Sequence, residues 1–240
     1  MAPSRPATLI WAQPAPASHR GLSRERIVRA AIEVADDGGE RALTMAAVAG
    51  RLGSYTAMAL YRHVPGKEAL IDLMVDEVTA EVSLPEPPGT DWRADLHALA
   101  LSTWEMTMRH PWYARVVHSS PPLGPNMLRR TESILAVLTA QGATTADAVA
   151  YAALLDGYVL GGALQAAAEQ ELARRYGLSN DQELAAAVSA ARDRVAASGR
   201  YPILSGWMAA PTVTTPARQL ELSLGFLFDG IAGRLPDPPA

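Results

Sequence analysis

The stretch that most constrains the fold is residues 44–70, which predict two short helices joined by a tight turn and followed at once by a third helix. Apolar residues spaced i, i+3, i+4 and i+7 from Met45 to Leu52 give the first helix one buried face. Gly53 suits the left-handed end of a helix, and Pro65 cannot continue the second helix. Helices this short are stable only when packed on neighbours. The pattern is typical of a helix-turn-helix, whose second helix enters the major groove of DNA.

The run LYRHVPGKEAL at 60–70, together with Thr44 and Leu52-Gly53, resembles the DNA-binding signature of the TetR family of bacterial repressors. The resemblance extends back through the predicted helix at 23–37. The segment from Gly53 to Leu60 is one residue longer than the family's commonest pattern. The sequence therefore leaves open which residues before Met58 face bases.

The resemblance implies how the DNA contacts divide between phosphates and bases. Arg62 has the best chemistry for reading a base, because guanidinium pairs bidentately with guanine, and a solvated surface charge is its alternative. Lys67, the only lysine, begins a helix, and helix N-termini attract phosphate. The implied phosphate contacts are Thr44, Tyr61, His63 and Lys67, and the implied base-reading residues are Thr56, Ala57, Met58 and Arg62.

The charge distribution agrees with one DNA-facing end. The net charge of −4 alone argues against nucleic acid. Residues 1–70, however, hold nine Lys or Arg against six Asp or Glu, whereas the remainder holds twelve against nineteen. A basic N-terminal part on an acidic body suits a protein that binds DNA at that end.

The rest of the chain predicts an all-α fold, because no alternating strand pattern appears. We expect a disordered arm at 1–21, a helix-turn-helix unit at 22–66, a connecting helix within 67–84 and a helical body at 85–240. The apolar run Leu9-Ile10-Trp11 lies in this arm, and the sequence does not indicate where it packs. The body helices are expected near 91–109, 112–118, 125–141, 145–176, 180–197 and 215–233, with a loop at 199–214.

Two further surfaces are predicted in the body, where the resemblance implies ligand binding and dimerisation. Small residues spaced by four at 153–161 allow close helix packing, either inside one protomer or at a dimer seam shared with the last helix. The candidate seam is Ala153, Gly157, Gly161, Leu220, Leu224, Leu227, Phe228 and Ile231. The candidate ligand-lining residues, each of which could equally be core, are Trp104, Met108, Trp112, Tyr113, Met127, Tyr151 and Tyr158. His110 and His118 could bind a polar ligand group or form loop hydrogen bonds.

Catalytic and metal-binding motifs are missing from the sequence. The five histidines are scattered without HExxH spacing, so neither a metal site nor a cofactor is expected. No GxSxG elbow or phosphate-binding glycine loop is present. Asp36-Asp37 are adjacent, do not share a helix face and are interpreted as solvated. We expect no membrane span, because no apolar run approaches about 20 residues, and the absence of cysteine fits a cytoplasmic location.

Taken with the resemblance, these features predict a homodimeric repressor that binds double-stranded operator DNA and is released by a small-molecule effector. Two alternatives remain open from the sequence. One is an activator or a regulator without a ligand. The other is a helical small-molecule-binding or enzymatic module whose head no longer reads DNA.

Overall fold

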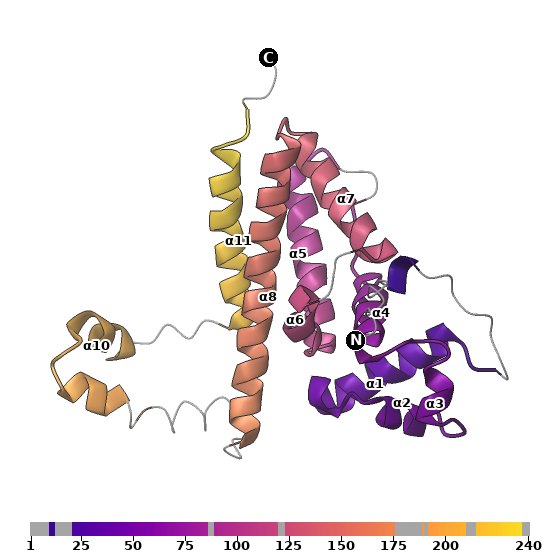
Figure 1. The fold of residues 1–240 in the computed structure, drawn as a ribbon. Coiled ribbons are helices and arrows are strands. Elements are labelled where there is room, and N and C mark those ends of the chain that lie inside the picture. Colours follow the sequence, from indigo (N-terminus) through magenta and orange to yellow (C-terminus); the bar gives the residue numbers. More distant parts are fainter. Residues whose placement is uncertain are drawn as a thin grey trace, which may run out of the picture.

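The computed structural model describes residues 10–12, 21–85, 89–119, 123–175, 189, 192–209 and 215–236. Helices dominate these residues and no strand occurs among them, which confirms the all-α prediction. A three-helix unit lies at one end of the molecule, and a taller bundle of helices rises from it (Figure 1).

The three-helix unit consists of α1 (Arg24–Ala42), α2 (Met45–Arg51) and α3 (Ala57–Leu60). Ser23 caps α1 by accepting a hydrogen bond from the Arg26 backbone N–H at 3.3 Å, as the sequence predicts. Gly39, with φ of 72°, interrupts the helical geometry near the end of α1. Gly53 has φ of 80° in the turn before α3, a conformation that favours glycine. The second helix of the motif was predicted to continue as far as Pro65, but its α-helical part is only four residues long.

Helix α4 (Lys67–Thr79) connects this unit to the body. It packs against α1 of this unit and against α5, α6 and α7 of the body. Leu70 and Met74 are fully buried, which places the apolar stripe of α4 in the core shared by the two parts. The connecting helix therefore touches both ends of the molecule that it joins.

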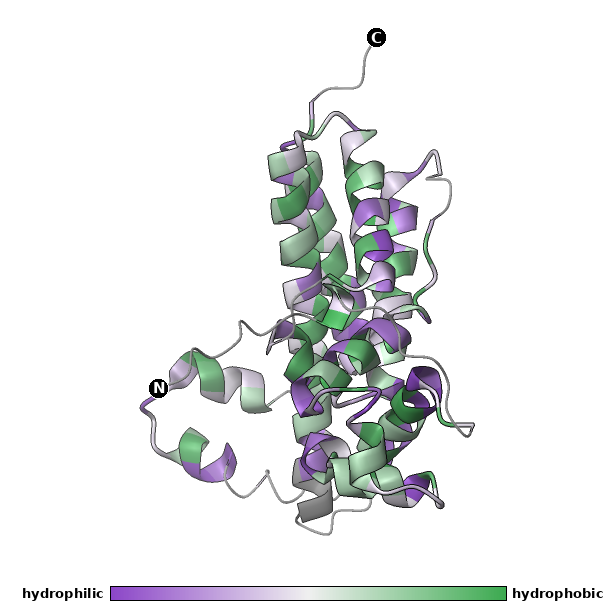
Figure 2. Ribbon diagram, turned by 45° about the vertical axis from the view of Figure 1, so that its right-hand side comes forward, coloured by the Kyte–Doolittle hydropathy of each residue, from purple (hydrophilic) through white to green (hydrophobic). Residues whose placement is uncertain are grey.

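The body is built from α5 (Trp92–Arg109), α6 (Tyr113–Val116), the 3-10 turn η2 (Val117–Ser119), α7 (Pro125–Thr139), α8 (Thr145–Arg175) and α11 (Pro216–Ala232). These helices agree with the predicted ranges to within a few residues. Helix α8 packs against α5, α6, α7 and α11. Figure 2 shows hydrophobic and hydrophilic residues on the same helices, as expected for amphipathic helices around a shared core.

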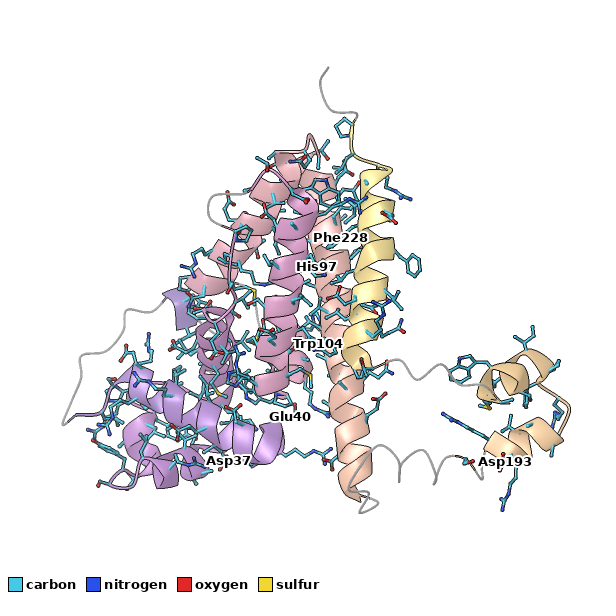
Figure 3. All side chains as sticks on the ribbon, turned by 180° about the vertical axis from the view of Figure 1, so that it is seen from behind. Asp37, Glu40, His97, Trp104, Asp193 and Phe228 are labelled. Carbon is cyan, nitrogen blue, oxygen red and sulfur yellow. The ribbon has the colours of Figure 1, made fainter. Side chains whose placement is uncertain are left out.

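The contact between α5 and α11 is well defined at the top of the body. The rings of Trp92 and Phe228 meet edge to face at 5.8 Å. His97 Nε2 lies 2.8 Å from the Glu221 carboxylate. Figure 3 shows His97 and Phe228 in this region, with Trp104 lower on α5. These contacts hold α11 against the body.

Three sequence predictions differ from the structure. The predicted loop at 199–214 contains α10 (Pro202–Ala209), which stands away from the body (Figure 1). The arm predicted to be disordered includes the 3-10 turn η1 (Ile10–Ala12), which packs on α4. The segment Thr145–Glu169 of α8, with mean hydropathy 1.2, is long and apolar enough to cross a membrane by length and composition, contrary to the expectation that no apolar run approaches that length. Its apolar residues instead serve the core, where Leu155 and Leu160 are buried.

The predicted helix at 180–197 lies mainly outside the described residues, which include only 189 and 192–197 of it.

Candidate functional site

The predicted DNA-reading surface is largely exposed on α3 and the turns beside it. Met58 is 73% exposed and Tyr61 is 45% exposed, and Thr56 and Arg62 are exposed as well. Ala57 is half-buried at the start of the helix. Leu60 and Val64 are fully buried and anchor the segment to the three-helix unit. An exposed apolar side chain such as Met58 beside a guanidinium suits contact with base edges in a groove.

Three other predicted DNA contacts have defined local roles. Thr44 caps α2, because its Oγ1 accepts a hydrogen bond from the Ala47 backbone N–H at 3.1 Å. Lys67 is exposed at the start of α4, and its Nζ lies 3.4 Å from the Glu40 carbonyl oxygen. His63 is only 6% exposed, and its Nδ1 is buried with no hydrogen-bond partner among the described residues. His63 therefore offers little surface to a phosphate, unlike Tyr61 and Lys67.

A cavity of about 340 Å³ lies inside the body, beside α4. Helices α4 to α8 and the η2 turn contribute to its walls, and Trp11 of η1 joins them. Most of its lining is apolar, with a few carboxylates, hydroxyls and one guanidinium between. Its lining residues are Trp11, Asp72, Val75, Asp76, Thr103, Tyr113, Val117, His118, Gly124, Met127, Arg130, Thr131, Leu135, Val149, Ala152, Ala153, Asp156 and Leu160.

Arg130 of α7 is a buried charged residue of this cavity and is 4% exposed. Its two terminal nitrogens donate to the Asp156 carboxylate of α8 at 2.6 and 3.1 Å, and Nη2 also lies 3.2 Å from Thr103 Oγ1. Burial works to lower the pKa of Arg130, but the carboxylate of Asp156 outweighs it and the pKa is raised. The guanidinium therefore stays charged, as a bidentate pair requires.

Asp76 links α4 to the beginning of α7 at the edge of the cavity. Its carboxylate accepts hydrogen bonds from the Met127 backbone N–H at 2.9 Å and from Asn126 Nδ2 at 3.0 Å. Burial raises the pKa of Asp76 against the effect of these hydrogen bonds. A Cβ at Gly124 would lie within 2.1 Å of this carboxylate, so the close approach requires glycine. Movement of α4 is thereby tied to movement of α7.

Two of the seven predicted ligand residues, Tyr113 and Met127, line this cavity. Tyr113 is buried, and its hydroxyl lies 3.2 Å from Thr79 Oγ1 of α4. Trp104 instead packs beneath Gly162, and Tyr158 donates a hydrogen bond to the Gln219 carbonyl at 3.3 Å. Met108, Trp112 and Tyr151 also lie outside the lining. Of the two histidines considered for a ligand, His118 lines the cavity.

A polar junction joins α1 to the body, and the sequence interpretation missed it. His110, at the end of α5, lies between two carboxylates: Nδ1 is 2.8 Å from Asp36 Oδ1, and Nε2 is 3.1 Å from Glu81 Oε1. Trp112 Nε1 also donates to Asp36 Oδ1, at 2.7 Å. Asp36 is thus a partner of the body rather than part of a solvated pair, while its neighbour Asp37 pairs with Arg51 inside the three-helix unit.

The predicted dimer residues divide into buried and exposed groups. Leu220, Leu224, Phe228 and Ile231 lie in the core of the protomer, so they cannot also cover a partner's surface. Ala153 lines the cavity, and Leu227 is half-buried. Gly157 and Gly161 are exposed, with open space where a side chain would extend. The exposed large apolar residues in the described parts of these two helices are Val149, Leu154, Leu222 and Phe226, and Phe226 is 77% exposed.

Residues 84–235 match the model of the tetracyclin repressor-like C-terminal domain. The chain is 38% identical to the transcriptional repressor DrrR1 of Streptomyces coeruleorubidus over 206 residues, which cover 84% of this chain and 76% of DrrR1. It is 30% identical to the class C tetracycline repressor protein of Escherichia coli over 158 residues, covering 64% of this chain and 71% of that protein.

Solved structures agree with these relatives. The Streptomyces coelicolor protein ActR, in complex with actinorhodin, superposes with a TM-score of 0.78 at 27% identity, covering 91% of this chain and 99% of ActR. The chain therefore belongs to the TetR family of transcriptional regulators. Like the repressors it is similar to, it is a DNA-binding transcriptional regulator.

Proposed function

We propose that this regulator is a homodimeric repressor that an organic small molecule releases from operator DNA by binding in the cavity beside α4. The proposal divides the chain into a DNA-binding unit at 22–66, a connecting helix within 67–84 and a body at 85–240 for effector binding and dimerisation. Its work is binding, and no bond-making step is required of it.

The observation that carries the proposal is that α4 contacts both the cavity and the DNA-binding unit. Asp72, Val75 and Asp76 of this helix line the cavity, and the helix also packs on α1 of the DNA-binding unit. Lys67, a proposed phosphate contact, is the first residue of the same helix. A ligand that presses on α4 therefore acts directly on the helix that positions the DNA-reading surface.

The switch follows from population shift. An effector that binds one arrangement of α4 better than another favours that arrangement in proportion to its differential affinity. In a dimer, a shift of both DNA-binding units changes the spacing of the two recognition segments, which must match half-sites about one helical turn apart. Sequence-specific binding to the operator is then lost, and only weaker contacts to DNA phosphates remain. Operator and effector must weaken each other's binding by the same factor.

The cavity favours a particular kind of effector. Its walls are mainly apolar, and the charged pair Arg130–Asp156 lies among them. Such a site suits a flat or compact apolar molecule with a few oxygen atoms, because apolar walls supply most of the affinity and a few polar groups fix orientation. ActR, which is similar in fold, is known in complex with actinorhodin.

We place the dimer surface on the outward faces of α8 and α11, which lie side by side (Figures 1 and 3). On α8, Leu154, Gly157 and Gly161 follow one helical face, and on α11 Leu222 and Phe226 follow another. An exposed apolar face of this kind is typical of an interface, since it would otherwise remain in water. The glycines allow a second helix to approach closely.

Selection from a random pool of duplex DNA tests the DNA-binding function. The wild-type protein should enrich one motif with two related halves, reflecting a twofold dimer. The variant Arg200→Ala, at an exposed residue just before α10, should enrich the same motif, whereas Lys67→Ala should recover less DNA of every sequence. An empty selection by the wild-type protein would overturn the proposal.

A further inference from the structure

The short turn η1 reaches the cavity from a distant part of the sequence. Ile10 is 2% exposed, and η1 packs on α4 (the indigo segment beside α4 and α7 in Figure 1). Trp11, the next residue, lines the same cavity as Val75 and Arg130. The part of the cavity wall that η1 supplies therefore comes from residues that precede the DNA-binding unit in the sequence.

Two buried donors at this cavity have no acceptor among the described residues. They are Nε1 of Trp11 and Nε of Arg130, and both residues line the cavity. Buried N–H groups in proteins are nearly always hydrogen-bonded, because leaving one unpaired is unfavourable. Two unpaired donors on the lining of one cavity indicate a ligand that brings acceptor oxygens to them.

We propose that η1 is part of the effector site, and that Trp11 donates its Nε1–H to an acceptor oxygen of an aromatic effector whose other acceptor meets Arg130 Nε. This rests on the proposed function, since it assigns the cavity beside α4 to the effector. The indole adds a flat apolar wall, and its N–H adds specificity for molecules carrying a carbonyl or phenol oxygen. The N-terminal segment is then a specificity-determining part of the sensor.

The first test measures whether Trp11 closes the cavity, and it needs no ligand. The chain has no cysteine, so Val75→Cys places a single thiol on the buried α4 wall. Its rate of reaction with 5,5′-dithiobis(2-nitrobenzoate) reports access to that wall. Adding Trp11→Ala should raise the rate about tenfold, because thiol reactivity follows exposure. Adding Trp207→Ala, on exposed α10, should leave the rate unchanged. An unchanged rate with Trp11→Ala would overturn the placement of η1.

The second test uses 1,8-dihydroxyanthraquinone, a flat aromatic probe with carbonyl and phenol oxygens. Trp11→Phe, which keeps a ring but removes the N–H, should weaken its binding by about three- to tenfold, the effect of one lost hydrogen bond. Trp11→Ala should weaken it further, and Trp207→Phe should match the wild type. DNA affinity without the probe should be equal in all four proteins.

The outcomes separate the two proposals. If the wild-type protein does not bind the probe, the cavity is not a site for oxygenated aromatics, and both this inference and the effector site proposed above are overturned. If the wild type and both Trp11 variants bind it equally, the role of Trp11 is overturned while the effector cavity stands. Loss of DNA binding by Trp11→Ala alone would likewise contradict the assignment of this residue to the effector site.

Discussion

The Nε1–H of Trp112 in the body donates a hydrogen bond to Oδ1 of Asp36 in α1, at 2.7 Å and across 76 positions of sequence. His110 meets the same oxygen at 2.8 Å and joins it to Glu81, which follows α4. The DNA-binding unit is thus attached to the body by a directed polar junction as well as by the apolar contacts of α4. A junction of this kind fixes the angle at which α1 meets the body.

Trp112→Phe should loosen this junction. The indole is buried, and a hydrogen bond to a charged acceptor contributes about 1.5–3 kcal/mol. The free energy of unfolding in urea should fall by about that amount, and amide hydrogen exchange at the end of α1 should quicken. Trp207→Phe, on exposed α10, is the matched control and should behave as the wild type. Equal stability of the two variants would show that the junction contributes nothing.

Glu81 should give the junction a dependence on pH. Burial works to raise the pKa of Glu81, but hydrogen bonds from Arg109 and His110 outweigh it, so the pKa is lowered from its ordinary value of 4.5. A carboxyl whose folded pKa lies below its unfolded one stabilises the fold above the unfolded pKa, and that contribution is lost as pH falls through the folded pKa. The wild type should therefore be more stable than Glu81→Gln at pH 7, and the gap should close below pH 4.5 in urea denaturation. A gap that is constant with pH would contradict the assignment.

Lys67 can be probed directly because it is the only lysine. Bound DNA should protect Nζ from acetylation by acetic anhydride, as read by mass spectrometry of the peptide that contains it. Lys67→Ala should weaken binding about equally on all sequences and reduce the slope of log affinity against log salt by about one. Arg200→Ala, at an exposed residue just before α10, should change neither quantity. Full acetylation in the presence of saturating DNA would remove Lys67 from the interface.

Arg62→Ala should act differently from Lys67→Ala. If Arg62 reads a base, its loss should reduce affinity for the selected motif by about 1–3 kcal/mol and relax preference at one position of each half-site. Binding to scrambled DNA should change far less. Affinity measured on motifs carrying each base at that position distinguishes the two cases. A loss that is uniform across all sequences would make Arg62 a phosphate contact.

Phe226→Asp should disrupt the dimer. Phe226 is 77% exposed on the outward face of α11, so a carboxylate there disturbs no core contact but would be buried without a partner in an interface. Sedimentation should shift from dimer toward monomer, with loss of specific DNA binding. Leu128→Asp, at a half-exposed apolar residue of α7, is the control and should remain dimeric. A dimer that persists in Phe226→Asp would place the interface elsewhere.

Local patterns were enough to predict most of the helices. The turn at Gly53 and the apolar stripe from Met45 to Leu52 depend on neighbouring residues, so residue type and periodicity locate them. The buried side of α11 shows the limit of such patterns. Leu220, Leu224 and Phe228 form an apolar face whether it meets the protomer's own core or a partner, and only the packing decides between the two.

The site residues were harder to predict, because they depend on contacts between distant segments. Asp36 and His110 are 74 positions apart, and Arg130 and Asp156 are 26 apart. Neither pair has a spacing that marks it in the sequence. Trp11 stood out as part of the apolar run Leu9-Ile10-Trp11 in the N-terminal arm, but its place on the cavity wall depends on the fold of the body. Met58, implied as a base-reading residue, is exposed, whereas His63, implied as a phosphate contact, is buried, and only the packing of the three-helix unit decides this difference.

The most direct test of the central claim is fluorescence anisotropy at physiological salt, using DNA from upstream of the protein's own gene against scrambled DNA of the same length. A sequence-specific regulator should bind the upstream fragment about a thousandfold more tightly or better, the lower end for specific complexes. DNA that carries the motif recovered from the random pool should show the same ratio of affinity over scrambled DNA, wherever that motif lies in the genome. Equal, weak binding to the upstream fragment, the selected motif and the scrambled DNA would contradict a repressor that reads sequence.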